Sequence, residues 1–162
     1  MKIINTSESL WSFALAFYAR EDVAETCLLL QDHHKVNVCL LIGLHWLDTK
    51  GCILSTADMA DLSAHTQTWT QEIVEPLRSL RRILRNPVET FPSDELQEQV
   101  RGSIKQAELL AEKKLLVEIE RWSTKISVHA NPCSNFNINQ YFTSLKMDEG
   151  FVESVIKKLT EQ

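Results

Sequence analysis

The stretch "LLLQDHHKVNVCLLIGLHWL", residues 28–47, decides the fold because it joins two helical patterns through one short polar turn. Its second part, residues 38–47, is apolar on nearly every side of a helix, and such a helix belongs in the middle of a bundle. Asn37 stands directly before it, where an N-cap side chain accepts a hydrogen bond from a first-turn N–H group. The stretch therefore predicts a buried hairpin that contains a central apolar helix.

Helix-start signals lie on both sides of this hairpin. Asn5 is the expected N-cap of a helix whose apolar residues recur at helical spacing from residue 10 to residue 18. Asp22 and Glu25 form a capping box for the helix that leads into the hairpin. Ser55 and Asp58 form another capping box after it. These signals predict three further helices around the hairpin.

Two longer helical patterns occupy the middle of the chain. The first runs from about residue 65 to residue 84, and Pro76 inside it should kink or restart the helix. Ser93 is the expected cap of the second, which continues for about seven turns. Its expected buried seam consists of Leu96, Val100, Ile104, Ala107, Ala111, Leu115, Ile119 and Trp122.

The composition agrees with a helical fold. The 162 residues include only four glycines and four prolines, which argues against a turn-rich β fold. We therefore expect an all-α, single-domain helical bundle of about six to eight helices over residues 1–129. Residues 130–162 begin with an Asn-rich turn and continue with two short helical patterns. This C-terminal appendage should pack on the bundle, within one chain or exchanged between two chains.

Charge and cysteine usage narrow the function classes. The formal net charge of −5 draws the chain neither to nucleic acid nor to acidic lipid. The four cysteines show no CxxC spacing, so we expect thiols in a reducing, cytoplasmic compartment. The apolar run "LWSFALAFYA", residues 10–19, is interpreted as a retained amphipathic helix rather than a signal segment. No apolar run reaches the roughly 18 residues that a membrane span requires.

Three stretches carry a family resemblance. They are "LWSFALAFYAREDVAETCLLLQDHHKVNVCLLIGLHWL", "WTQEIVEPLRSLRRIL" and "IKQAELLAEKKLL". Together they resemble the signature segments of an uncharacterised proteobacterial family of small all-helical proteins, over roughly residues 10–120. Three positions depart from the family pattern: Lys35 replaces a usual glycine, Cys39 a usual asparagine, and His45 interrupts an apolar stretch. The resemblance implies a helical fold and carries no activity with it.

Charged residues of the middle segment suggest a binding face. Arg78, Arg81, Arg82 and Arg85 recur at i, i+3, i+4 and i+7, which places them on one continuous face of a helix. The expected acidic neighbours are Asp32, Glu108 and Glu112. Two readings stay open: salt bridges at the margin of the bundle, or unmatched arginines that bind a carboxylate, a phosphate or an acidic helix. Asp32 is expected to pair with Arg78 first and Arg82 second.

The polar residues of the hairpin favour neither metal binding nor catalysis. At most two side chains of the quartet Gln31 to His34 converge on one point, whereas zinc requires three or four ligands. His45 is expected to bond a backbone carbonyl at the edge of the core. The chain contains no GxSxG, P-loop, GxGxxG or Cys–His pattern that would indicate a reaction. We therefore expect no metal and no cofactor.

The sequence favours a non-catalytic, cytoplasmic interaction module. It would bind an acidic protein surface or a small anionic ligand through the arginine-lined face, as a monomer or a homodimer, without nucleic acid or membrane. The expected binding residues are Gln31, Asp32, Asn37, Arg78, Arg81, Arg82, Arg85, Glu108 and Glu112. The alternative is a helical enzyme or carrier with an internal pocket near Asp32, Asn37, Arg78 and Glu108.

Overall fold

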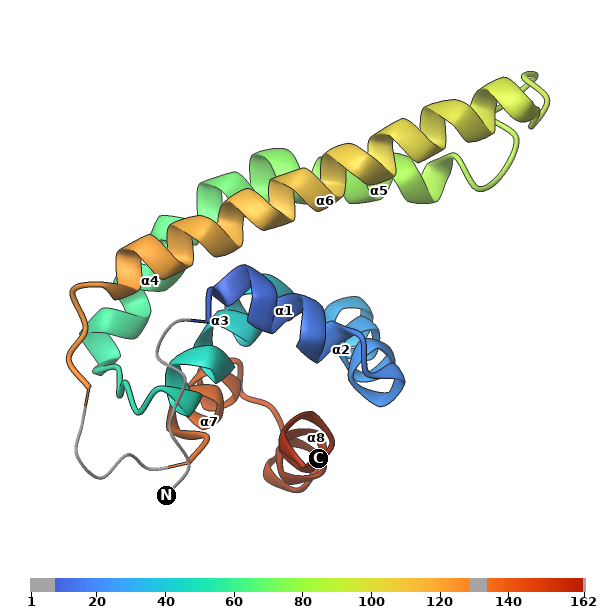
Figure 1. Cartoon of the computed structure of the whole chain (residues 1–162). Helices are drawn as coiled ribbons and strands as arrows, with labels where there is room; N and C mark the ends of the chain where they lie inside the picture. The colour runs from blue at the N-terminus through green and yellow to red at the C-terminus, as the bar shows by residue number, and fades with distance from the viewer. Residues whose placement is uncertain (1–7, 129–133, 162) are drawn as a thin grey trace. The chain divides into compact units, whose positions relative to one another are not determined.

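The computed structural model describes residues 8–128 and 134–161, which are predominantly α-helical, as the sequence predicts (Figure 1). The elements in chain order are α1 (Leu10–Tyr18), α2 (Glu21–His34), α3 (Val38–Thr49), α4 (Thr56–Trp69), the π-helical turn η1 (Thr70–Val74), α5 (Glu75–Ile83), α6 (Glu95–Ser123), α7 (Phe136–Ser144) and α8 (Glu149–Thr160). No helix in this part of the chain is both long enough and apolar enough to cross a membrane.

The chain divides into two compact units. Unit 1 comprises the described parts of residues 1–62 and 116–162, and unit 2 comprises residues 63–115. Both boundaries between the units fall inside helices, one in α4 and one in α6. This division differs from the expected one between residues 129 and 130, because the C-terminal helices contribute to the core of unit 1.

Helix α3 is the centre of unit 1 and contacts α1, α2 and α7. Asn37 caps it as expected, because its Oδ1 accepts a hydrogen bond of 3.1 Å from the Leu40 N–H group. Nearly all of its apolar side chains are buried, which confirms the central apolar helix. Gly43 is needed for close packing inside this unit, since a Cβ atom there would lie 2.8 Å from Cγ2 of the buried Ile119.

The turn between α2 and α3 contains Lys35, the residue that departs from the glycine of the family pattern. Lys35 adopts the left-handed conformation, with φ 55° and ψ 30°, and the N–H group of Val36 reaches back to the Leu30 carbonyl. This geometry is the Schellman end of a helix, which glycine adopts without a steric penalty. The chain therefore retains the turn, although a lysine stands at its strained position.

The C-terminal helices pack on unit 1, with α7 against α3 and α8 against α2. Asp48 of α3 accepts hydrogen bonds from the backbone N–H groups of Asn137 and Ile138 and so caps α7. The buried Asn137 side chain bonds backbone groups of Leu54 and Cys52. The tail helices therefore lie on unit 1 within one chain, and Phe136 and Leu145, which were expected to be covered, are each 37% exposed. The buried residues of the tail are Asn137, Ile138, Tyr141, Phe142, Val152, Val155, Ile156 and Leu159.

Some of the expected caps differ from those observed. Ser55 and Asp58 form the predicted reciprocal capping box of α4. Ser9 caps α1, whereas Asn5 lies outside the described residues. Asp94, one residue after the expected Ser93, accepts from the N–H group of Gln97 and caps α6. Helix α2 begins after Arg20 without a side-chain cap, so the box predicted at Asp22 is wrong.

Pro76 marks the restart of the helix in unit 2, as predicted. It occupies the first turn of α5, directly after the π-helical turn η1. A proline lacks the N–H group for an i to i−4 bond, and its ring clashes with the preceding turn. The wider π turn provides a way to accommodate both effects without ending the helix.

Helix α6 differs most from its prediction. The seam residues from Ala111 onward, which are Ala111, Leu115, Ile119 and Trp122, are buried. In contrast, Leu96 is 68% exposed and Val100 is 52% exposed. The predicted burial of the seam is therefore wrong for its first half, and this half belongs to unit 2.

Candidate functional site

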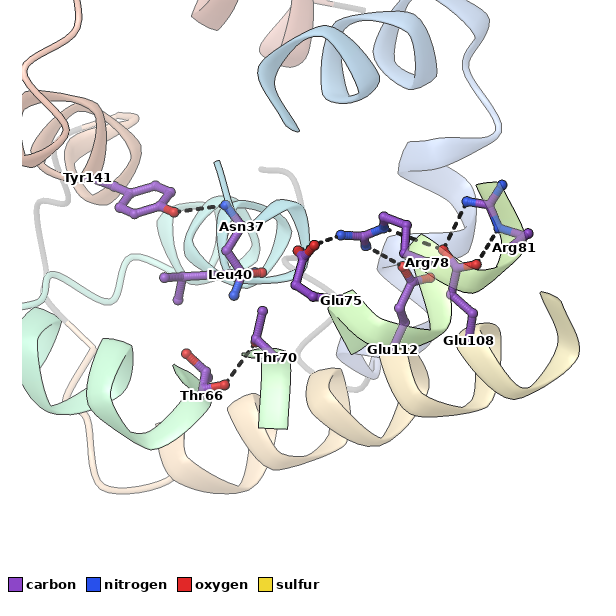
Figure 2. A network of polar contacts seen from close by, with 10 residues as sticks. All are labelled: Asn37, Leu40, Thr66, Thr70, Glu75, Arg78, Arg81, Glu108, Glu112 and Tyr141. Carbon is purple, nitrogen blue, oxygen red and sulfur yellow. Dashed lines mark hydrogen bonds and ion pairs between the residues drawn. The ribbon is translucent and has the colours of Figure 1, made fainter. Parts of the chain in front are cut away.

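Unit 2 encloses a cluster of charged side chains between α5 and α6 (Figure 2). Arg78 of α5 is buried, and each of its three guanidinium nitrogens faces a carboxylate. Nη1 lies 2.8 Å from Glu75, Nη2 lies 2.9 Å from Glu112, and Nε lies 3.4 Å from Glu108. Glu108 is one of the two acidic partners that the sequence left open for Arg78.

Glu108 joins the two arginines of the cluster. It is buried, and its two oxygens accept hydrogen bonds from Nε and Nη2 of Arg81, a fork that suits the planar guanidinium. Two arginines and three carboxylates leave the cluster with a formal charge of −1. Removing one member of this set leaves an uncompensated charge on its partners. Because these partners are buried, water solvates that charge poorly and the fold loses stability.

The electrostatics of the cluster follow from burial and neighbours. Burial acts to lower the pKa of Arg78, but Glu75, Glu112 and Glu108 outweigh it and raise that pKa. Burial raises the pKa of Glu112, and the nearby Glu108 carboxylate raises it further, against the lowering effect of Arg78. Arg78 therefore stays charged, and it is the group that keeps Glu112 from protonating more readily.

The four residues of the arginine-lined face thus lie in two environments. Arg78 and Arg81 point into the cluster, whereas Arg82 and Arg85 are exposed. The guanidinium nitrogens of Arg78 are occupied by Glu75, Glu108 and Glu112, so its expected buried pair with Asp32 is wrong. Helical spacing indicates that four residues share a face, but it does not indicate which of them the neighbouring helix covers.

The expected site residues of the hairpin lie in unit 1. Asp32 is exposed near the end of α2, so its carboxylate does not carry the burial cost that suggested a buried partner. Gln31 is half-buried on the same helix. Asn37 uses its side chain to cap α3, and its backbone N–H group donates to the Tyr141 hydroxyl (Figure 2).

A second feature of unit 2, which the sequence reasoning missed, follows from the position of this cluster. At 100° per residue, the residues of α5 that face α6 are centred near Arg78 and Arg81, and those of α6 that face α5 near Glu108. One apolar stripe on each helix lies about 100° from that direction. Because the helices run antiparallel, these two rotations bring both stripes to the same side of the hairpin.

We call this surface the apolar side. Its residues are Ile73, Leu77, Leu80 and Leu84 around α5, and Leu96, Val100, Ser103, Ala107 and Leu110 on α6. Leu110 is 66% exposed and Leu80 is 47% exposed, in addition to Leu96 and Val100. A shallow hollow of about 490 Å³ follows the α6 stripe and is lined by Leu96, Gln99, Val100, Ser103, Ile104 and Ala107.

The other side of the hairpin is charged. The same rotation places Glu75 and Arg82 of α5 there, with Glu98 and Lys105 of α6. Leu109 also lies on this charged side and is 52% exposed. The hairpin is therefore amphipathic across its width, with a charged seam between its helices, an apolar side and a charged side.

Unit 1 contains two groups with shifted pKa values. Burial, with a smaller contribution from Arg20, lowers the pKa of His45 to about 4. The ring packs against Phe13 and Phe17, and its Nδ1 is buried without a hydrogen-bond partner among the described residues, unlike the carbonyl bond expected. Burial raises the pKa of Asp48 to about 6, although the N–H groups that it accepts from lower it.

The described residues form neither a disulfide nor a cluster of metal ligands. Cys27, Cys39 and Cys52 are buried as thiols, and burial raises the pKa of Cys27 to about 12. Cys133 lies outside the described residues. Within residues 8–128 and 134–161, no three His, Cys, Asp or Glu side chains are grouped as a metal ion would require.

Comparison with known proteins identifies a family but no annotated relative. A family model described as "Protein of unknown function (DUF2390)" matches residues 9–119. The match includes all of unit 2 and stops before α7 and α8. No curated protein and no solved structure matches the chain.

Proposed function

Because the chain belongs to the DUF2390 family of proteins of unknown function, its role must be inferred from its surface, and we propose that it is a non-catalytic interaction module. Unit 2 is the binding part, and its apolar side is the surface that another polypeptide covers. The proposal keeps the class of function expected from the sequence and moves the binding surface away from the arginines.

One observation carries this proposal: the hairpin buries charges between its helices and turns leucines outward. Arg78 and Glu108 are 7% and 6% exposed, whereas Leu96 and Leu110 are 68% and 66% exposed. Burying a leucine side chain is worth about 1.5–3 kcal/mol. A contiguous apolar surface of this kind marks a binding surface, whereas single exposed apolar residues carry no such meaning.

The arginine-lined face supports a second candidate. Arg82 and Arg85 are exposed, and a carboxylate or phosphate prefers the planar fork of a guanidinium. An acidic partner or a small anionic ligand would bind there. We rank this candidate second because Arg78 and Arg81 already have carboxylates of their own.

Photocrosslinking in living cells tests the proposal. A benzophenone amino acid replaces Val100 on the apolar side, and a matched variant carries it at Lys105 on the charged side of the same helix. We expect Val100 to give a discrete adduct of higher mass and Lys105 to give none. No adduct at Val100, or equal adducts at both positions, would overturn the proposal.

We also place the protein in the cytoplasm. The three described cysteines are buried thiols, and a reducing compartment maintains that state. Fractionation of cells that express the untagged chain tests this assignment. Recovery from a membrane or an oxidising compartment would contradict it.

A further inference from the structure

We infer that the polypeptide that covers the apolar side is a second copy of this chain, so that two hairpins pair about a two-fold axis. This inference rests on the proposed function and names its partner. The pairing would form a four-helix bundle from two copies of α5 and two of α6.

The chemistry of the apolar side favours a copy of itself over an acidic or basic partner. None of its nine residues carries a charge, and Ser103 is the polar one among them; the hollow on α6 adds the amide of Gln99 as a further polar group. In a two-fold interface each surface meets itself, so a charged residue near the axis would meet its own charge. An acidic helix would instead require several cations beside the leucines. Helical spacing places Lys114 there, at the end of the α6 stripe, whereas the arginines of α5 lie in the seam and on the charged side.

The composition of the interior of unit 2 also favours a polypeptide that covers the apolar side. Its buried residues are Thr66, Val74, Arg78, Glu108, Ala111 and Leu115. Two of these six are charged and Ala111 is small, so this interior contains little apolar volume. Pairing two apolar sides would supply a second, apolar layer to each hairpin, because the leucines of both copies would become interior.

The dimensions of the surface define the strength of the pairing. The α6 stripe from Leu96 to Leu110 is about 21 Å long, and two packed helices are about 20 Å wide. The contact is thus about 400 Å² per copy in projection, and the corrugated side chains increase the accessible area above that figure. The two copies together would bury about 800 Å² in projection, which is below the roughly 1,200 Å² of stable complexes, so we expect a weak dimer that dissociates on dilution.

Sedimentation of the purified full-length chain tests the inference, over concentrations from about 1 to 200 µM. Leu110→Gln and Leu109→Gln make a matched pair, since both leucines are exposed neighbours on one helix and only Leu110 lies on the apolar side. We expect a concentration-dependent dimer that Leu110→Gln weakens at least about tenfold and Leu109→Gln leaves unchanged. Equal weakening by both changes would overturn the inference, as would a wild-type monomer at all concentrations.

A chemical crosslink locates the contact independently of the mass. Ser103→Cys lies midway along the α6 stripe, and Lys105→Cys lies on the charged side. A short bismaleimide should link two copies through residue 103 but not through residue 105, with the wild-type chain as the control for its native cysteines. A dimer that links only through residue 105 would overturn the proposed contact.

The two proposals fail in different ways. If the purified chain is a monomer and Val100 still gives adducts in cells, a different protein covers the apolar side. That result overturns the inference of a second copy and leaves the proposed function standing. If Val100 gives no adducts, the apolar side is not a binding surface and both proposals are overturned.

Discussion

Replacing Arg78 by methionine should destabilise unit 2, because this arginine is the buried cation that three carboxylates share. Breaking a buried ion pair costs about 3–5 kcal/mol. We expect about 3 kcal/mol, at the lower end, since the Glu75 side chain is half exposed and is readily solvated once its partner is lost. Methionine fills a similar volume, so the loss reports charge rather than a cavity.

The loss should depend on pH. The pKa of Glu112 is already raised by burial in the folded chain, and removal of Arg78 should raise it further. A carboxyl group whose folded pKa lies above its unfolded pKa stabilises the fold fully at low pH and loses that contribution as the pH rises. Arg78→Met should therefore cost more at pH 8 than at pH 5.

Urea denaturation followed by circular dichroism measures this loss, and amide hydrogen exchange in α5 assigns it to unit 2. Arg101→Met is the matched control, because Arg101 pairs with the exposed Glu98 three residues before it and should cost under about 1 kcal/mol. Equal losses for the two variants, or a loss at Arg78 without pH dependence, would refute the reasoning.

Three further predictions concern unit 1. Gly43→Ala should cost about 1–2 kcal/mol in urea denaturation, because a Cβ atom there would lie 2.8 Å from Ile119 Cγ2. Combined with Gly43→Ala, Ile119→Leu should restore part of this loss, whereas Ile119→Val, which keeps Cγ2, should restore none of it. Lys35→Gly should stabilise the chain by about 1 kcal/mol in the same assay, because glycine adopts the left-handed turn without strain; a loss of stability would contradict the turn geometry. Burial raises the pKa of Asp48 from 3.8 to about 6, so the stability of the wild type relative to Asp48→Asn should fall as the pH rises from about 4 to 6. A rise or no change in that relative stability would show that Asp48 is not held in this environment.

Local signals in the sequence predicted local structure well. The Asn37 cap, the capping box of Ser55 and Asp58, and the restart at Pro76 all depend on residues within one turn of each other. The burial of the tail was also predictable, since so many apolar residues in a short segment require a cover.

Contacts between distant segments were harder to predict. Periodicity shows that α6 has an apolar seam, but it does not show what packs on the seam, and Leu96 and Val100 prove to be exposed. The partner of Arg78 was ambiguous for the same reason, because Asp32 and Glu108 are equally acidic in the sequence. The apolar side became visible only when the Arg81–Glu108 contact defined how the two helices face each other.

The most direct test of the central claim compares thiol labelling of Leu109→Cys and Leu110→Cys inside cells, each normalised to the rate for the unfolded chain. Both side chains are exposed in the free chain, 52% and 66%, so without a bound polypeptide they should label alike. If a polypeptide covers the apolar side, position 110 should label about tenfold more slowly than position 109 at an occupant concentration of about ten times its Kd. Equal labelling of the two positions in cells would contradict the account.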